Sequence, residues 1–145
     1  MSQYKVTLLL GSNLGDQKKN LENAIVEIEN KIGNVISQSN FLYSNPVEFA
    51  SFNIFCNIAI LIGTHLSPVE VLNTIKSIEK SMGRECDSAF YGEYKDRIID
   101  IDIVTYNNVN FESKKLSIPH KKHIEEREFS QSVLNNLKRS EKHRL

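Results

Sequence analysis

Two carboxylates stand two residues apart in a segment that otherwise has the composition of a buried β-strand, Arg97-Ile98-Ile99-Asp100-Ile101-Asp102-Ile103-Val104. A strand alternates its side chains between two faces, so Asp100 and Asp102 share one face and the isoleucines share the other. Two steps of strand rise place their Cα atoms roughly 6.5–7 Å apart. The carboxylates repel each other unless a cation lies between them, and Mg²⁺ prefers such oxygen ligands, often together with phosphate oxygens. The pair indicates a Mg²⁺–phosphate site, with a solvated strand face as the alternative.

Composition and charge fit one globular domain over residues 1–145, with 40% hydrophobic and 25% charged residues. Eighteen basic residues balance eighteen acidic ones, which argues against a nucleic-acid or membrane partner. The first residues lack a signal-peptide pattern, and no apolar run is long enough to span a membrane. Only two cysteines occur, Cys56 and Cys86, without metal-ligand spacing. We therefore expect a cytoplasmic protein, a monomer, with Cys56 buried.

The order of the predicted elements supplies a scaffold for the Asp100–Asp102 strand. A strand over 4–10 leads into the turn Gly11-Ser12-Asn13-Leu14-Gly15-Asp16, and a helix follows with Asp16 as N-cap and Gly33 at its C-terminal end. Strands are expected over 35–43 and 54–62. The order strand, helix, strand, strand, helix, strand predicts an α+β fold, a ferredoxin-like βαββαβ antiparallel sheet with helices packed on it and long catalytic loops.

The second helix has an unusually complete start. Ser67 is the expected N-cap, Pro68 takes the first helical position and Glu70 completes a capping box, while Gly83 marks the end. The irregular segment 85–96 is predicted to form a lid over a site. After a turn at Asn107-Asn108, we expect an extended return over 109–118, a short helix over 126–137 and a solvated charged tail.

Two single residues leave alternatives open. Asn57 interrupts the apolar strand 54–62, and an amide buried there either supports a neighbouring loop or binds a ligand. Glu79 lies near the end of the second helix, where an acid opposes the macrodipole, so it needs a compensating partner or a functional use.

Several motifs occur together in a fixed order along residues 4 to 130. They resemble those of the 6-hydroxymethyl-7,8-dihydropterin pyrophosphokinase family of folate biosynthesis. The motifs are Gly11-Ser12-Asn13-Leu14-Gly15-Asp16, Glu79 and Arg84 around Gly83, Arg97-x-x-Asp100-x-Asp102, Pro119-His120 and Arg127-x-Phe129. The resemblance implies an enzyme that transfers the pyrophosphoryl group of ATP to the pterin hydroxymethyl group and releases AMP. It also implies two Mg²⁺ ions carrying ATP on Asp100 and Asp102.

The resemblance further implies a role for each matching residue. The catalytic residues are Arg84, Arg97, Asp100 and Asp102, and the ATP-binding residues are Glu79, Arg84, Arg97, His120 and Arg127. The pterin-binding residues are Asn45, Val47, Phe55, Asn57, Asp100 and Phe129. Phe55 and Phe129 would stack on the flat pterin, and arginines suit phosphate because they are always charged and offer paired donors.

The chain departs from the family pattern in places. Cys86 stands where the family usually has a second arginine, and Phe55 replaces the commoner tyrosine. Two other functions remain open: a ferredoxin-like module that binds nucleotide or pterin without catalysis, and a two-metal nucleotidyl transferase of palm-like architecture. The latter needs nucleic-acid binding, which a net charge of zero disfavours.

Overall fold

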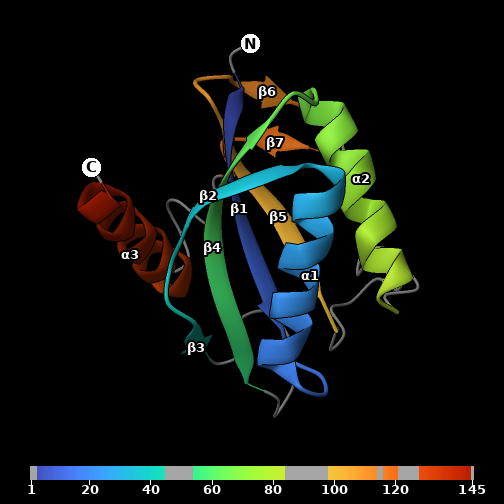
Figure 1. Cartoon of the computed structure of the whole chain (residues 1–145), viewed down its shortest axis with the longest axis vertical. Helices are drawn as coiled ribbons and strands as arrows, with labels where there is room; N and C mark the ends of the chain where they lie inside the picture. The colour runs from blue at the N-terminus through green and yellow to red at the C-terminus, as the bar shows by residue number, and fades with distance from the viewer. Residues whose placement is uncertain (1–2, 45–53, 84–97, 114–115, 121–127, 145) are drawn as a thin grey trace.

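One antiparallel sheet organises the computed structural model, which describes residues 3–44, 54–83, 98–113, 116–120 and 128–144 (Figure 1). The sheet has the strand order β2-β4-β1-β5, and a short β3 also pairs with β4. With one helix after β1 and one after β4, this is the predicted ferredoxin-like α+β arrangement, which is confirmed. The elements are β1 (Tyr4–Ser12), α1 (Gln17–Lys31), β2 (Gly33–Gln38), β3 (Leu42–Ser44), β4 (Phe55–Thr64), α2 (Pro68–Ser81) and β5 (Asp100–Tyr106).

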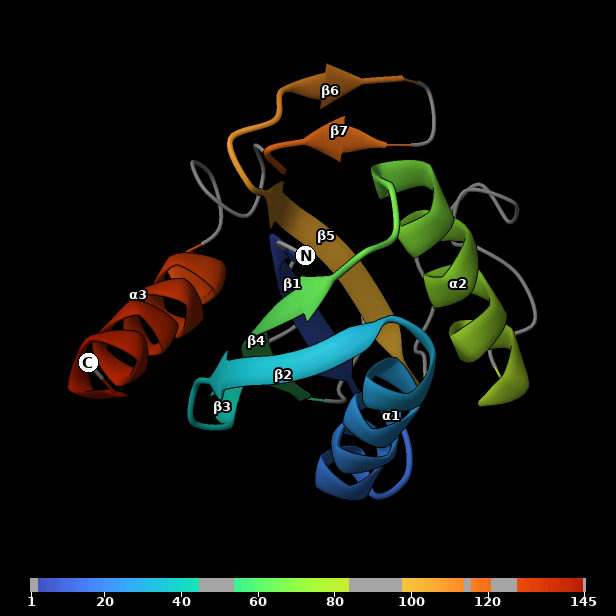
Figure 2. The same ribbon diagram turned by 45° about the horizontal axis from the view of Figure 1, so that its top comes forward.

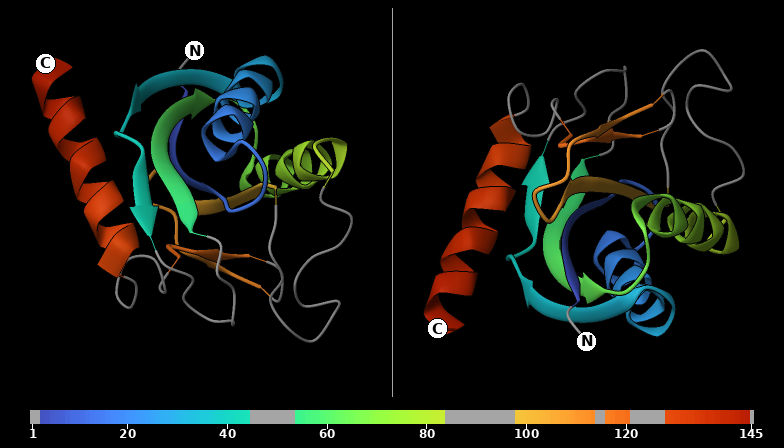
Figure 3. Two further views of the ribbon diagram at one scale, coloured as in Figure 1. Left: turned by 90° about the horizontal axis from the view of Figure 1, so that it is seen from below. Right: turned by 90° about the horizontal axis from the view of Figure 1, so that it is seen from above.

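Helices cover both faces of the sheet. The helices α1 and α2 lie on one face, and α3 (Glu128–Arg144) lies on the other, as Figures 2 and 3 show. Leu8 and Leu10 of β1 are buried in the cluster under α1 and α2, whereas Leu9 is buried in the cluster under α3. Burial on both faces explains why β1 and β4 are continuous apolar runs.

Helix ends follow the predicted capping chemistry, with one exception. The backbone N–H of Lys19 donates to Asp16 Oδ1 over 3.3 Å. Ser67 and Glu70 exchange the two bonds of a capping box, and the bond from the Ser67 backbone lowers the pKa of the Glu70 carboxyl. Gly83 ends α2 with a φ of +105°. The prediction that Gly33 is the C-cap was wrong, because α1 ends at Lys31 with Ile32 as its C-cap, and Gly33 begins β2.

Three other expected elements differ in the structure. The strand expected over 35–43 is two strands, β2 and β3, separated by a bend in which Ser39 bonds to Ala59. The return over 109–118 contains a small hairpin, β6 (Phe111–Glu112) and β7 (Ser117–Ile118). The helix α3 continues to Arg144, so most of the expected solvated tail is helical. The lid expected over 85–96 lies outside the described residues.

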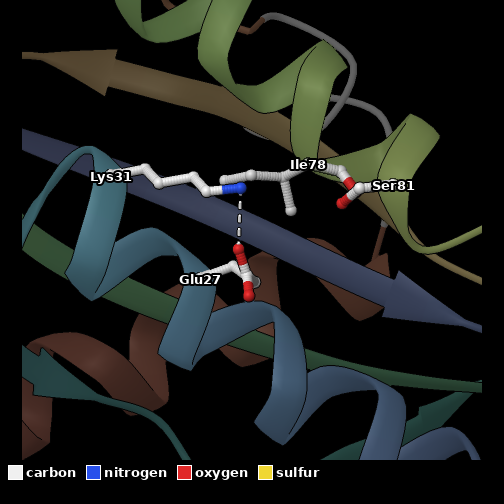
Figure 4. Close-up of polar contacts among 4 residues, drawn as sticks. All are labelled: Glu27, Lys31, Ile78 and Ser81. Carbon is white, nitrogen blue, oxygen red and sulfur yellow. Dashed lines mark hydrogen bonds and ion pairs between the residues drawn. The ribbon is translucent and has the colours of Figure 1, made fainter.

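Surface polar contacts contribute little to this scaffold. Figure 4 shows Glu27 and Lys31 of α1, whose ion pair spans 2.9 Å at the surface, and Ser81 Oγ of α2, which donates to the Ile78 carbonyl over 2.9 Å. Exposed pairs of this kind are worth a few tenths of a kcal/mol, about 0.3–0.5 for an i,i+4 pair.

Cys56 is fully buried, as expected, and burial raises the pKa of its thiol. None of the helices among the described residues is long and apolar enough to cross a bilayer.

Candidate active site

Strand pairing brings together three predicted site positions that are far apart in the sequence. Asp100 of β5 is the direct partner of Gly11 in β1, and Gly11 is in turn the direct partner of Asn57 in β4. Directly paired residues project to the same face of a sheet. Asn57, Gly11 and Asp100 therefore form one row across three strands, called here the Asn57–Gly11–Asp100 row.

This row lies on the α3 side of the sheet. Ile99, Ile101 and Ile103 are buried in the cluster under α1 and α2, so the alternation along β5 turns Asp100 and Asp102 to the opposite face. Both acids are half-buried. The prediction that they share one face, away from the isoleucines, is confirmed.

Toward the N-terminal end of β1, the same face of the sheet becomes apolar. Leu9 pairs directly with Asp102 and with Ala59. Leu9 and Ala59 pack in one cluster with Val133 and Leu137 of α3. The two acids thus lie beside an apolar layer that α3 covers, and the site occupies the part of this face nearest the C-terminal end of β1.

Gly11 provides room in the middle of the row. A Cβ atom at this position would lie 3.0 Å from Asn57 Oδ1 and 3.4 Å from the Phe55 ring. Phe55 stands two residues before Asn57 in β4 and therefore projects to the same face. The glycine allows both side chains to lie over β1. The sequence suggested only that Gly11 begins a turn, because the close approach depends on the pairing with β4.

Asn57 is 3% exposed and its amide is held by β3. Its Nδ2 donates to Ser44 Oγ over 2.8 Å and to the Leu42 carbonyl over 3.4 Å. The first alternative for this residue, support of a neighbouring segment, is thus confirmed. The same bonds leave Oδ1 beside Gly11, in the row with Asp100. No signal in the sequence pointed to Ser44 beyond its place just before Asn45-Pro46.

The glycine turn after β1 is fixed by α1. Asn20 Nδ2 donates to Ser12 Oγ over 3.2 Å and to the Leu14 carbonyl over 2.8 Å. Ser12 and Asn13 are buried, and Gly15 has a φ of +65°, which favours glycine. These contacts hold the C-terminal end of β1, and with it Gly11, in one place.

Two predicted ATP-binding residues form hydrogen bonds with the backbone of β5, one with a residue before Asp102 and the other with a residue after it. Glu79 of α2 is 1% exposed, and its Oε2 accepts a hydrogen bond from the Ile101 N–H over 2.8 Å. The backbone N–H of His120 donates to the Val104 carbonyl over 2.9 Å. Glu79 thus has the compensating partner that its place in the helix called for, and contact of either residue with a nucleotide stays a prediction.

The remaining site predictions lie wholly or partly outside the described residues. Phe129 is in the first turn of α3, and the structure describes its backbone. The positions outside the described ranges are Asn45, Val47, Arg84, Arg97 and Arg127.

No cluster of three or more His, Cys, Asp or Glu side chains within the described ranges could hold a metal ion. Asp100 and Asp102 offer the hard oxygen donors that suit Mg²⁺, and phosphate oxygens would have to complete the shell.

Known proteins resemble this chain in sequence over most of its length. Residues 7–139 match the sequence model of the 7,8-dihydro-6-hydroxymethylpterin-pyrophosphokinase family. The chain belongs to this family. The resemblance deduced from the motifs is confirmed, and membership supports the predicted pyrophosphoryl transfer in folate synthesis.

Two relatives show how the family domain occurs in longer and shorter proteins. A 2-amino-4-hydroxy-6-hydroxymethyldihydropteridine pyrophosphokinase of Porphyromonas gingivalis is 34% identical over 79% of this chain and 78% of that protein. A folate synthesis bifunctional protein of Arabidopsis thaliana is 37% identical over 92% of this chain, which spans only 27% of that protein.

Solved structures agree on the fold. A Plasmodium falciparum HPPK-DHPS structure superposes with a TM-score of 0.69 at 18% identity, over 93% of this chain and 40% of that one.

Proposed function

We propose that this chain transfers the pyrophosphoryl group of ATP to the hydroxymethyl group of 6-hydroxymethyl-7,8-dihydropterin, with AMP and the pterin diphosphate as products. The observation that carries the proposal is the Asn57–Gly11–Asp100 row. It puts a predicted pterin-binding amide and a predicted metal-binding carboxylate on one face, with a glycine between them. Membership of the pyrophosphokinase family supports the same reaction.

In this proposal each described residue has a task. Asp100 and Asp102 would hold two Mg²⁺ ions, which would supply the charge neutralisation that transfer of a pyrophosphoryl group needs. Asn57 Oδ1 would accept a hydrogen bond from the edge of the pterin, since its Nδ2 is already engaged by β3. Phe55 would stack on the pterin ring, with Phe129 as the second ring.

The nucleotide would be held by residues around β5. His120 is attached to this strand, and Arg84, Arg97 and Arg127 would add fixed positive charge and paired donors for the phosphates. Glu79 is attached to the same strand at Ile101 and would act through the strand. Asn45 and Val47 would contribute backbone groups to the pterin. A cytoplasmic monomer without nucleic-acid or membrane partners stays the prediction from the sequence.

The nature of the nucleotide product tests the proposal. The protein should convert ATP to AMP in an amount equal to the pterin diphosphate formed, only when both Mg²⁺ and the hydroxymethylpterin are present. Product analysis by chromatography with removal of Mg²⁺ by a chelator would check this. ADP as product, or turnover independent of the pterin, would contradict the proposal, whereas calorimetric binding of both substrates without reaction would favour the non-catalytic module.

Replacing Gly11 by alanine should weaken pterin binding. The added methyl group would lie 3.0 Å from Asn57 Oδ1, so this oxygen must shift by a few tenths of an ångström, whereas 3.4 Å to the Phe55 ring is an ordinary contact. Loss of the hydrogen bond that Asn57 Oδ1 would make to the pterin costs about 0.5–1.5 kcal/mol, which corresponds to a rise of KM for the pterin of about 2–13-fold. The KM for ATP, measured in the same assays, serves as the internal control and should change little. An equal rise of both KM values would show that the substitution disturbs more than the pterin side of the row.

A further inference from the structure

We propose that Glu79 is a positioning residue for the two metal-binding aspartates. Its buried carboxylate holds the backbone of β5 at Ile101, midway between Asp100 and Asp102, and so fixes how the two acids are presented to a cation. This inference rests on the proposed function, and it assigns Glu79 a role through the strand instead of through contact with the nucleotide.

The bond lies at the outer edge of the sheet. In the order β2-β4-β1-β5, one side of β5 is hydrogen-bonded to β1, and no described strand is hydrogen-bonded to its other side. An edge strand presents backbone N–H groups that need partners when they are shielded from water. The Ile101 N–H obtains its partner from another element, Glu79 Oε2 of α2, over 2.8 Å.

Burying a carboxylate at this place is costly for the helix. Glu79 is 1% exposed, between core residues such as Ile75 and Ile78. An acid near the C-terminal end of a helix opposes the macrodipole, and a buried ionised group must be paired or hydrogen-bonded. The ion pair with Lys76 is long, 3.7 Å, and Lys76 is 47% exposed, so it offsets little of this cost. The hydrogen bond to Ile101 is a contact that a leucine of similar size could not make.

Ile101 is then fixed on two sides. Its side chain is 3% exposed in the cluster under α1 and α2, and its N–H is held by the buried Glu79 side chain. Because Asp100 and Asp102 are its direct neighbours, the backbone that carries both carboxylates cannot twist freely. Groups that orient metal ligands in this indirect way typically change metal affinity or activity by about 10–100-fold when they are removed.

The test compares metal binding by Glu79→Leu and Glu79→Gln with that of the unmodified protein. Mn²⁺ is titrated in the presence of a nonhydrolysable ATP analogue, and affinity is read from the broadening of amide NMR signals around Asp100 and Asp102. Glu79→Leu should weaken Mn²⁺ binding by about 10–100-fold. Glu79→Gln keeps an acceptor oxygen and should recover most of the affinity. Glu27→Gln, which removes a surface carboxylate of α1, is the matched control and should bind as the unmodified protein does.

Two results would overturn the inference. One is a folded Glu79→Leu protein with unchanged Mn²⁺ affinity. The other is a rise in KM for ATP with unchanged metal affinity, which would assign Glu79 to the nucleotide. Should Glu79→Leu not fold, hydrogen exchange of the unmodified protein decides: the Ile101 amide should exchange as slowly as the amides bonded within the sheet, and fast exchange would refute the role. A protein that binds Mn²⁺ yet forms no AMP would refute the proposed function, while the affinity comparison would still decide the role of Glu79.

Discussion

Replacing Asp100 or Asp102 by asparagine should lower kcat by about 10³-fold, because each carboxylate supplies charge that neutral amides cannot replace at a metal–phosphate site. The two acids project from one face of β5, half-buried and two residues apart. Asparagine has nearly the same shape, so the fold should be retained. Removal of one of two neighbouring negative charges relieves repulsion, and the melting temperature should therefore stay unchanged or rise.

Steady-state kinetics and thermal unfolding of the same preparations would check this prediction. Glu112→Gln, which removes an exposed carboxylate from β6, is the matched control and should have normal kcat. Near-normal turnover of either aspartate variant would show that the metal assignment is wrong. A large fall in melting temperature would instead indicate that the acids serve the fold.

Replacing Gly33 by alanine should lower the free energy of unfolding by about 3 kcal/mol, at the upper end of the usual cost of overpacking. A Cβ atom at this position would lie 1.9 Å from the Gly63 carbonyl oxygen and 2.8 Å from its carbonyl carbon. Both are backbone atoms of β4, so no side-chain rotation can relieve the clash. The start of β2 would have to move away from β4, where Gly33 pairs with Thr64.

The neighbouring glycine in β4 offers a close comparison. The atoms nearest to a Cβ atom at Gly63 would belong to the Gln3 and Asn34 side chains, whose ends can move, and Gly63→Ala should therefore cost less than about 1 kcal/mol. Urea denaturation of both variants, at constant m-value, gives the comparison. Equal losses for the two variants would show that the close approach of Gly33 to β4 is not what makes glycine necessary there.

Local signals in the sequence predicted the elements well where the decisive residues are close together in the chain. The capping box of α2 needs only Ser67 and Glu70, and the shared face of Asp100 and Asp102 follows from strand alternation alone. The signals failed where packing decides. Val133 and Leu137 pack against the sheet, and α3 continues from there to Arg144, seven residues beyond the expected end of the helix.

The sequence by itself determined the two carboxylates, their common face, the order of the elements and the family to which the chain belongs. Only the tertiary structure decided which residues surround the acids. Gly11 and Asn57 join Asp100 through strand register, and Glu79 reaches Ile101 across 22 positions of sequence. The physical reason is that caps and alternation depend on neighbours along the chain, whereas register and the hydrogen bond at the edge of β5 depend on how the sheet and the helices pack.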